Sequence, residues 1–326
     1  MGKLIEGRWD PSDAQPSNER GEFVRGKSSY RDFVRADGST PYTPQAGRYH
    51  LYVAHACPWA HRTLIARALL GLEEAISVSS VHPLMLEQGW TFRAEPGLAR
   101  DPIFGAKALW EIYVHADPKA TGKATVPVLW DRERATIVNN ESREILRMLC
   151  TEFLPLARTP RELSPAALRA QIDGVLDAIY APINNGVYRC GFARSQEAYD
   201  AAVRELFGAL DHWEGVLGRQ RFTCGDQLTE ADIALFTTLF RFDLVYATHF
   251  KCNLRRLVDY PNLFGFVRDV YQTPGVAGTC DVARIKQHYY GSHGFINPQR
   301  IVPIGFAIDY EAPHDRATRF GRGEAR

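Results

Sequence analysis

One cysteine stands where a strand is expected to turn into a helix, and a proline follows it directly. Cys57 lies in the stretch ACPWAHR, after the alternating, apolar-rich run 49–54 and before a helix-like segment that continues to about residue 70. Pro58 suits the first helical position because it has no N–H to lose there. Cys57 then faces the unpaired backbone N–H groups of the first turn, which favour an ionised thiol. We interpret Cys57 as a thiolate nucleophile.

The thiolate needs support that a cysteine in water does not have. An ordinary cysteine is only about 3% ionised at neutral pH, and lowering its pKa to roughly 6 takes about 3.4 kcal/mol. A helix dipole supplies at most ~2 kcal/mol. Amide N–H groups must supply the rest, with Arg62 helping only if it points inward. The alternatives are an inert buried cysteine, or a zinc site from His55, Cys57 and His61, whose spacing matches no usual zinc finger. His61 is more often a packing or capping residue than a general base.

No second cysteine is in reach of the first. Position 60 holds alanine where a dithiol redox protein would carry a cysteine, and the six cysteines of this 326-residue chain form no CxxC pair. Cys57 therefore cannot resolve its own mixed disulfide locally, and a cosubstrate thiol must do so. Scattered cysteines and a polar N-terminal segment without the apolar core of a signal peptide favour a reducing, cytoplasmic location.

The pattern around Cys57 predicts an α/β domain. The order is β-α-β, a long insert at 82–122, and then β-β-α, in which the stretch NNES opens the last helix. That order indicates a thioredoxin-like layer at residues 46–155 rather than a doubly wound sheet. Residues 1–45, rich in Pro, Gly, Ser and charge, are expected to form an extended N-terminal arm.

The second half of the chain reads as helical. Apolar residues recur at steps of three and four through residues 199–217, and Thr229 with Asp232 resembles a capping box ahead of the next helix. We predict an all-helical domain at 160–290, with helices at 261–272 and 280–290, and a C-terminal tail at 291–326 packed on the surface.

Charge and composition exclude several kinds of partner. The formal net charge is +1, from 39 basic and 38 acidic residues, and no long block of like charge occurs. We therefore expect no nucleic-acid partner. No apolar run is long enough to span a bilayer, so no membrane partner is expected either, and no metal site is predicted.

Several motifs together carry a resemblance to a known family. At superfamily level the chain resembles the glutathione transferases in ACPWAHR, TVPVLWD, IVNNES and LTEADIALF. More closely, it resembles their xi class, the glutathionyl-hydroquinone reductases, in GEFVRGKSSYRDFV, RYHLYVAHACPWAHRTLIAR, ADPKATGKATVPVLWDRERATIVNNESREILRML, NNGVYRCGFA and HYYGSHGFINPQRIVP. The resemblance runs over nearly the whole chain. It implies a thioredoxin-like glutathione-binding domain followed by a C-terminal helical glutathione-transferase domain, and a homodimer.

The resemblance also implies where glutathione binds. The proline of VP, Pro127, is cis in that fold, so that the backbone N–H and C=O of Val126 pair with the cysteinyl unit of glutathione like an added strand. Ser142 would hold the γ-glutamyl carboxylate at a helix N-terminus, and Glu141 would pair with the ammonium group. The alternatives are a plain edge-strand proline and a plain helix cap.

Further contacts follow from the same resemblance. Trp90 matches a tryptophan beside glutathione, and Lys123 falls where a basic residue would meet the glycine carboxylate. Tyr188 and Tyr289 match tyrosines that contact the quinol, and Tyr290 competes with Tyr289 for that role. Trp59 is a further candidate for the substrate pocket. For each, ordinary packing or solvation is the alternative.

The implied activity is reduction of glutathionyl-hydroquinones to hydroquinones. Cys57 takes the glutathione as a mixed disulfide, and a second glutathione releases it as oxidised glutathione. One alternative is an omega-like thioltransferase or dehydroascorbate reductase, which would share the thiolate and the cosubstrate. Another is a non-catalytic glutathione-fold binding protein, which would not need a reactive Cys57.

Overall fold

The predicted strand–helix–strand sequence around Cys57 is confirmed. In the computed structural model, which describes residues 2–12 and 16–321, this part of the chain forms β3 (Tyr49–Val53), α1 (Pro58–Leu69) and β4 (Ile76–Ser80). Every residue of β3 is buried, as expected for a strand at the centre of a covered sheet.

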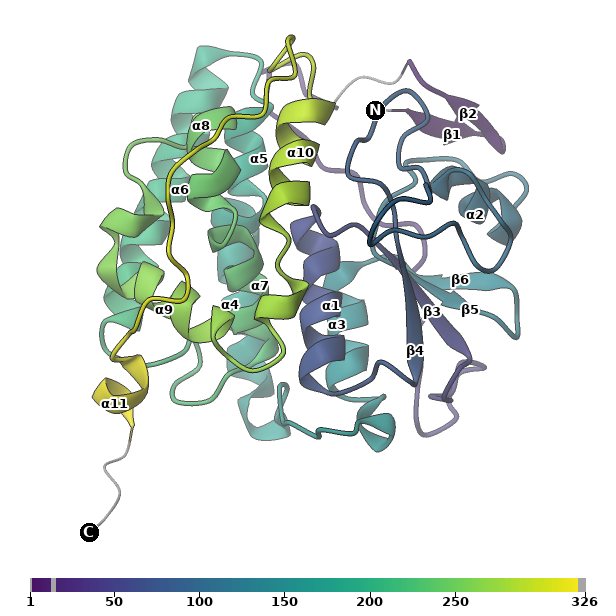
Figure 1. Cartoon of the computed structure of the whole chain (residues 1–326), viewed down its shortest axis with the longest axis horizontal. Coiled ribbons are helices and arrows are strands. Elements are labelled where there is room, and N and C mark those ends of the chain that lie inside the picture. Colours follow the sequence, from purple (N-terminus) through teal and green to yellow (C-terminus); the bar gives the residue numbers. More distant parts are fainter. Residues whose placement is uncertain (1, 13–15, 322–326) are drawn as a thin grey trace. The chain divides into compact units, whose positions relative to one another are not determined.

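The hairpin and the helix that follow it are confirmed as well. They are β5 (Val128–Asp131), β6 (Thr136–Asn139) and α3 (Ser142–Cys150), with Glu141 as the N-cap of α3. Helices α1 and α3 lie side by side in Figure 1 and pack against each other. Most residues of both helices are buried.

The four strands run in the order β4-β3-β5-β6. Strands β3 and β4 are parallel, whereas β5 is antiparallel to both β3 and β6. The carboxyl ends of β3, β4 and β6 therefore meet the amino end of β5 at one edge of the sheet. Cys57, Trp90, Glu141 and Val126 all lie in the segments that leave from this edge.

Three short elements in this part were not predicted. The insert contains α2 (Leu109–Ala116), and the N-terminal arm begins with a hairpin of β1 (Lys3–Ile5) and β2 (Arg8–Asp10). Eight residues give barely two helical turns, and three-residue strands show no readable alternation. Farther along, the arm runs beside β6, since Asp32 N–H donates to the Val138 carbonyl at 3.0 Å.

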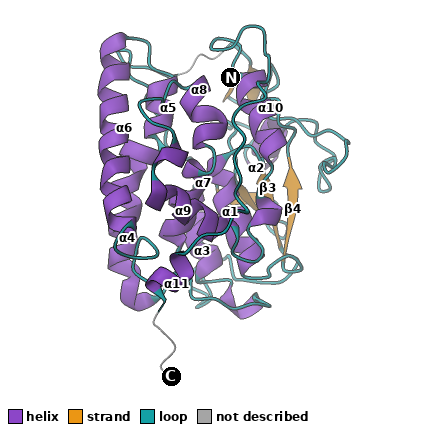
Figure 2. Ribbon diagram, turned by 60° about the vertical axis from the view of Figure 1, so that its left-hand side comes forward, coloured by secondary structure: helices purple, strands orange, loops and turns teal. Residues whose placement is uncertain are grey.

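The second group of elements is almost wholly helical. Figure 2 shows its longest helix, α6, with α5 beside it. The capping box predicted at Thr229 is confirmed, because the Thr229 N–H and hydroxyl both donate to the Asp232 carboxylate at 2.8 Å. The helices are α4 (Arg169–Ile179), α5 (Gly186–Gly191), α6 (Gln196–Leu217), α7 (Glu230–Leu239), α8 (Ala247–His249), α9 (Pro261–Tyr271) and α11 (Arg316–Phe320), joined in part by short 3-10 and π turns.

The chain separates into two compact units whose limits differ from the predicted domains. The sheet unit comprises residues 1–15, 26–161 and 279–302, and so includes α10 (Val282–Ser292); the helical unit comprises 16–25, 162–278 and 303–326. A helical periodicity shows which face of a helix is buried, but not which core buries it. The periodicity therefore predicted this helix, but we assigned it to the helical domain, whereas the structure places it in the sheet unit.

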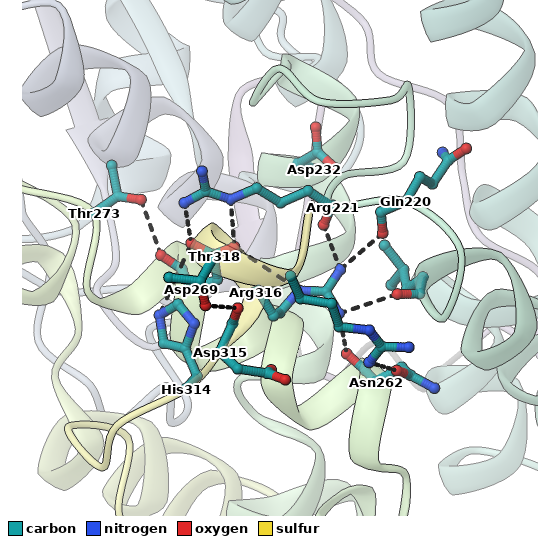
Figure 3. A network of polar contacts seen from close by, with 12 residues as sticks. Gln220, Arg221, Asp232, Asn262, Asp269, Thr273, His314, Asp315, Arg316 and Thr318 are labelled. Atoms are coloured by element: carbon teal, nitrogen blue, oxygen red, sulfur yellow. Dashed lines mark hydrogen bonds and ion pairs between the residues drawn. The ribbon is translucent and has the colours of Figure 1, made fainter. Parts of the chain in front are cut away.

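Within the helical unit, helix α11 is anchored by a buried arginine. Arg316 on α11 is 1% exposed and donates to the carbonyl groups of Leu217 and Gln220, each at 3.0 Å. Asp269 accepts two hydrogen bonds from Arg221 beside it (Figure 3). Earlier in the predicted surface tail, Ile304 is almost fully exposed.

Among the residues that the structure describes, no helix combines the length and apolar character needed to cross a membrane. In the same residues, no group of three or more His, Cys, Asp or Glu side chains is arranged to hold a metal ion.

Candidate functional site

The candidate site starts at the junction between β3 and α1. Cys57 is the N-cap of α1, with an extended backbone, and Pro58 occupies the first helical position. The His61 N–H donates to the Cys57 carbonyl at 3.0 Å, which closes the first helical turn. The thiol is half-buried. The sequence-based geometry of a cysteine at a helix start is therefore confirmed.

The second component is the segment before β5. The Val126–Pro127 peptide bond is cis, as the resemblance implies. Cys57 Sγ lies 3.8 Å from the carbonyl oxygen of Val126, to which the thiol donates. The structure thus brings Cys57 together with the backbone that was predicted to pair with a peptide ligand.

The third component is the start of α3. The Glu141 side chain accepts a hydrogen bond from the Arg143 N–H at 3.3 Å, and Ser28 of the arm donates to Glu141 Oε2 at 2.9 Å. Ser142 is buried and begins the helix. A helix start with an acidic neighbour is the kind of arrangement that can bind a zwitterion, because backbone N–H groups favour a carboxylate and an acidic side chain favours an ammonium group.

A buried arginine links the first and third components. Arg62 on α1 is 3% exposed, and its guanidinium donates to Ser142 Oγ at 3.4 Å. The same guanidinium lies 4.5 Å from the centre of the Trp59 ring, a cation–π distance. Arg62 therefore points inward, as its predicted contribution requires, and Trp59 lies beside it.

The segment after β4 and helix α10 carry three more of the predicted residues. Trp90 is 8% exposed and stacks on His288 of α10, with ring centres 4.8 Å apart. Tyr289 and Tyr290 on the same helix are buried. The His288 ring donates to the Pro83 carbonyl at 2.8 Å, so this histidine ties α10 to the segment that holds Trp90. Lys123 is half-buried in the segment between α2 and β5.

Tyr188 belongs to the helical unit. It lies on α5, and its ring packs against Phe192, Tyr246 and Phe250. The Arg25 guanidinium lies 4.7 Å from the centre of the ring. This aromatic cluster fixes the orientation of the tyrosine within its unit.

Sequence reasoning missed several residues that shape the site. Ser28, Tyr113, Asn139 and His288 each contact a predicted residue or its immediate neighbour. The Asn-Asn pair before Glu141 was a usable signal, because asparagine at a helix start commonly bonds nearby backbone. Tyr113 had no signal, since it lies in an insert without a recognised helix.

His61 and Cys280 form a separate contact between α1 and the start of the segment that leads into α10. His61 Nε2 lies 2.8 Å from Thr279 Oγ1 and 3.8 Å from Cys280 Sγ, and the histidine is fully buried. The imidazole packs between α1 and the segment before α10, in keeping with the packing role considered for it.

Comparison with protein families matches both halves of the chain. Residues 56–152 match the family described as Glutathione S-transferase, N-terminal domain. Residues 196–269 match Glutathione S-transferase, C-terminal domain.

Individual proteins match over almost the entire length. The chain is 50% identical to the Glutathionyl-hydroquinone reductase YqjG of Escherichia coli (strain K12), over 98% of this chain and 100% of that one. Among solved structures, a Xi Class GST from Natrialba magadii superposes with a TM-score of 0.92 at 50% identity, covering 98% of each chain. The glutathione-bound structure of YqjG from Escherichia coli K-12 superposes with a TM-score of 0.90 at 48% identity, covering 98% of this chain and 100% of the other.

Proposed function

Since the chain belongs to the xi class of the glutathione S-transferase family, the glutathionyl-hydroquinone reductases, we propose that it reduces glutathionyl-hydroquinones with glutathione as the cosubstrate. The observation that carries this proposal is the contact between Cys57 Sγ and the Val126 carbonyl at 3.8 Å. The contact supports the proposal because the sulfur of Cys57, the proposed nucleophile, lies beside the backbone that is proposed to pair with a peptide thiol.

In the first step, the Cys57 thiolate attacks the sulfur of the glutathionyl-hydroquinone. The sulfur–carbon bond to the ring breaks, a disulfide forms between Cys57 and glutathione, and the ring carbon takes one proton, which releases hydroquinone. Tyr188 or Tyr289 is the proposed phenol that hydrogen-bonds the quinol oxygens and aids this proton transfer. Tyr290 and Trp59 are proposed to line the substrate pocket.

In the second step, a glutathione thiol loses its proton and attacks the mixed disulfide. Oxidised glutathione leaves and the Cys57 thiolate is restored, so the proton taken up in the first step is returned. The net reaction consumes one glutathionyl-hydroquinone and one glutathione, and yields one hydroquinone and one oxidised glutathione.

The proposed glutathione pose uses four parts of the site. The backbone of Val126, next to Pro127, pairs with the cysteinyl unit. Ser142 and the α3 start hold the γ-glutamyl carboxylate, and Glu141 pairs with the ammonium group. Trp90 packs beside the tripeptide, and Lys123 pairs with the glycine carboxylate. The N-cap position of Glu141 and the buried start of α3 support this arrangement.

The test is turnover of a defined substrate. Purified protein is incubated with a glutathionyl-hydroquinone and glutathione, and products are followed by chromatography. Equal amounts of hydroquinone and oxidised glutathione, with ping-pong kinetics, are expected. Absence of hydroquinone under saturating glutathione would overturn the proposal. Faster turnover of dehydroascorbate would favour the omega-like thioltransferase instead.

A homodimer and a cytoplasmic location are proposed from the resemblance and from the scattered cysteines. Light scattering at micromolar protein tests the first of these, and a monomer at all concentrations would contradict it.

A further inference from the structure

The two backbone segments that are proposed to bind glutathione, one before β5 and one after β6, lie at the same end of neighbouring strands. Val126 lies two residues before β5, and Glu141 lies two residues after β6. The regular pairing of these antiparallel strands reaches Leu129 opposite Asn139, and it is shifted by an irregularity next to that pair. Beyond this point the β5–β6 ladder pairs neither segment, so another contact must set their spacing.

The Tyr113 hydroxyl makes that contact. Tyr113 projects from α2 and is 3% exposed. Its hydroxyl donates to the Thr125 carbonyl at 2.8 Å and accepts from the Thr125 N–H at 3.2 Å. It also accepts from Asn140 Nδ2 at 3.0 Å. A phenol has one donor and two acceptor positions, so this oxygen is fully used by the residue before Val126 and the residue before Glu141.

Asn140 is fixed on its other side, which makes the bridge rigid. Its Oδ1 accepts from the Tyr30 N–H at 3.1 Å, and its own N–H donates to the Tyr30 carbonyl at 3.0 Å. The Tyr30 ring meets the Tyr113 ring edge to face, with centres 5.8 Å apart. Burial raises the pKa of Tyr113, so the phenol remains a neutral donor at working pH.

We propose that Tyr113 is a positioning residue that sets the spacing between Val126 and the Glu141–Ser142 helix start. The inference rests on the proposed function, because the spacing matters only if one ligand spans both segments. Glutathione reaches both through its γ-glutamyl linkage. A thiol that lacks the γ-glutamyl group engages only the Val126 side, so the bridge selects for the full tripeptide.

The experiment compares Tyr113→Phe with Tyr49→Phe. Tyr49 is a buried tyrosine of the same unit whose hydroxyl donates to the Thr43 carbonyl at 2.8 Å, away from both segments. For each protein, kcat/KM is measured with glutathione and with cysteinylglycine as the resolving thiol. Tyr113→Phe should lower the preference for glutathione roughly tenfold through KM, because misplacing a binding group by a fraction of an ångström weakens only the ligand that needs it. Tyr49→Phe should keep the wild-type preference.

If Tyr113 had only a structural role, Tyr113→Phe would lower kcat/KM for glutathione and for cysteinylglycine together and leave their ratio unchanged. That outcome would overturn the inference, whereas turnover by the wild-type protein would still uphold the proposed function. Absence of wild-type turnover would overturn both. Asn140→Ser removes the other half of the bridge. If Tyr113→Phe does not fold, Asn140→Ser should show the same loss of preference for glutathione. Both substitutions break the same bridge, so their effects should not add. The double variant should lose about as much preference for glutathione as the more affected single variant.

Discussion

The sulfur of Cys57 lies 3.8 Å from the carbonyl oxygen of Val126, although 68 residues separate the two in the chain. The contact follows from the sheet, because β3 ends where the antiparallel β5 begins. A peptide that pairs with the Val126 backbone therefore carries its own side chain next to the cysteine. For a cysteinyl peptide, that side chain is the thiol with which Cys57 would exchange.

Cys57→Ala should abolish turnover while the fold remains. Alanine keeps the helix start but removes the nucleophile, so kcat should fall by at least about 1000-fold. Product formation measures the loss, and intact mass should show one bound glutathione on the wild-type protein after incubation with substrate alone. Cys280→Ala, which changes another half-buried thiol of the same unit, is the control. Normal turnover by Cys57→Ala would exclude the mechanism.

Ser142→Ala should weaken glutathione binding more than it slows the chemistry. The hydroxyl is proposed to bond a carboxylate, and hydrogen bonds to charged groups contribute about 1.5–3 kcal/mol. KM for glutathione should therefore rise by roughly 10- to 100-fold, with a smaller change in kcat. Arg62 also loses its contact to Ser142 Oγ, so the thermal midpoint is recorded as well. Ser39→Ala on an exposed loop is the matched control, and equal KM values in the two variants would remove Ser142 from the binding site.

The sequence predicts those parts of the site that depend on local chemistry. Cys57 followed by Pro58 predicts one helix start, and Thr229 with Asp232 predicts another. Both helix starts are confirmed. The strands β3, β4, β5 and β6 follow from their alternation and their turns. Each of these features is decided within a few residues of the chain, where propensity and hydrogen-bonding capacity act directly.

The parts that escaped prediction depend on contacts between distant residues. Tyr113 is a tyrosine in a Pro- and Gly-rich insert, and nothing nearby indicates that its hydroxyl will join Thr125 to Asn140. Ser28 reaches Glu141 across 113 positions. Helix α10 was located correctly, but only the structure assigns it to the sheet unit. Contacts between residues that are far apart in the chain depend on how the core packs, and a single sequence does not show that packing.

Acidification should destabilise the protein through buried histidines. Burial, assisted by the nearby Arg132, lowers the pKa of His50 from 6.5 to about 4. Between these values the unfolded chain binds a proton that the folded chain does not bind, so stability is present above pH 6.5 and is lost as the pH falls toward 4. At pH 5 the loss from His50 is roughly 2 kcal/mol.

Urea unfolding at pH 7 and pH 5 measures this loss. His50→Gln should be less stable at pH 7, because it loses the contact of the ring with Ser77 Oγ at 2.7 Å. Its stability should nevertheless fall less between the two pH values than that of the wild type. His212→Gln, at an exposed position of α6, should keep the wild-type pH dependence. Identical pH dependence in wild type and His50→Gln would assign the acid sensitivity to other groups, among them His249, whose pKa burial also lowers to about 4.

Gly191→Ala should destabilise the helical unit because no space exists for a methyl group. A Cβ atom at this last residue of α5 would lie 2.2 Å from two ring carbons of Phe250, which is fully buried. The ring must shift, and overpacking of this kind costs about 1–3 kcal/mol. Phe250 packs against Tyr188 with ring centres 5.5 Å apart, so the shift should also raise KM for the quinol if Tyr188 contacts it.

The matched variant is Gly208→Ala on α6, where a Cβ atom meets nothing within 4 Å. Alanine is favoured over glycine in a helix by up to ~1 kcal/mol, so this variant should be as stable as the wild type or more so. Urea unfolding of both variants isolates the steric effect from the gain in helix propensity that they share. Equal stability of the two would mean that Phe250 moves aside without cost, and the packing of Phe250 would then not be what holds Tyr188 in place.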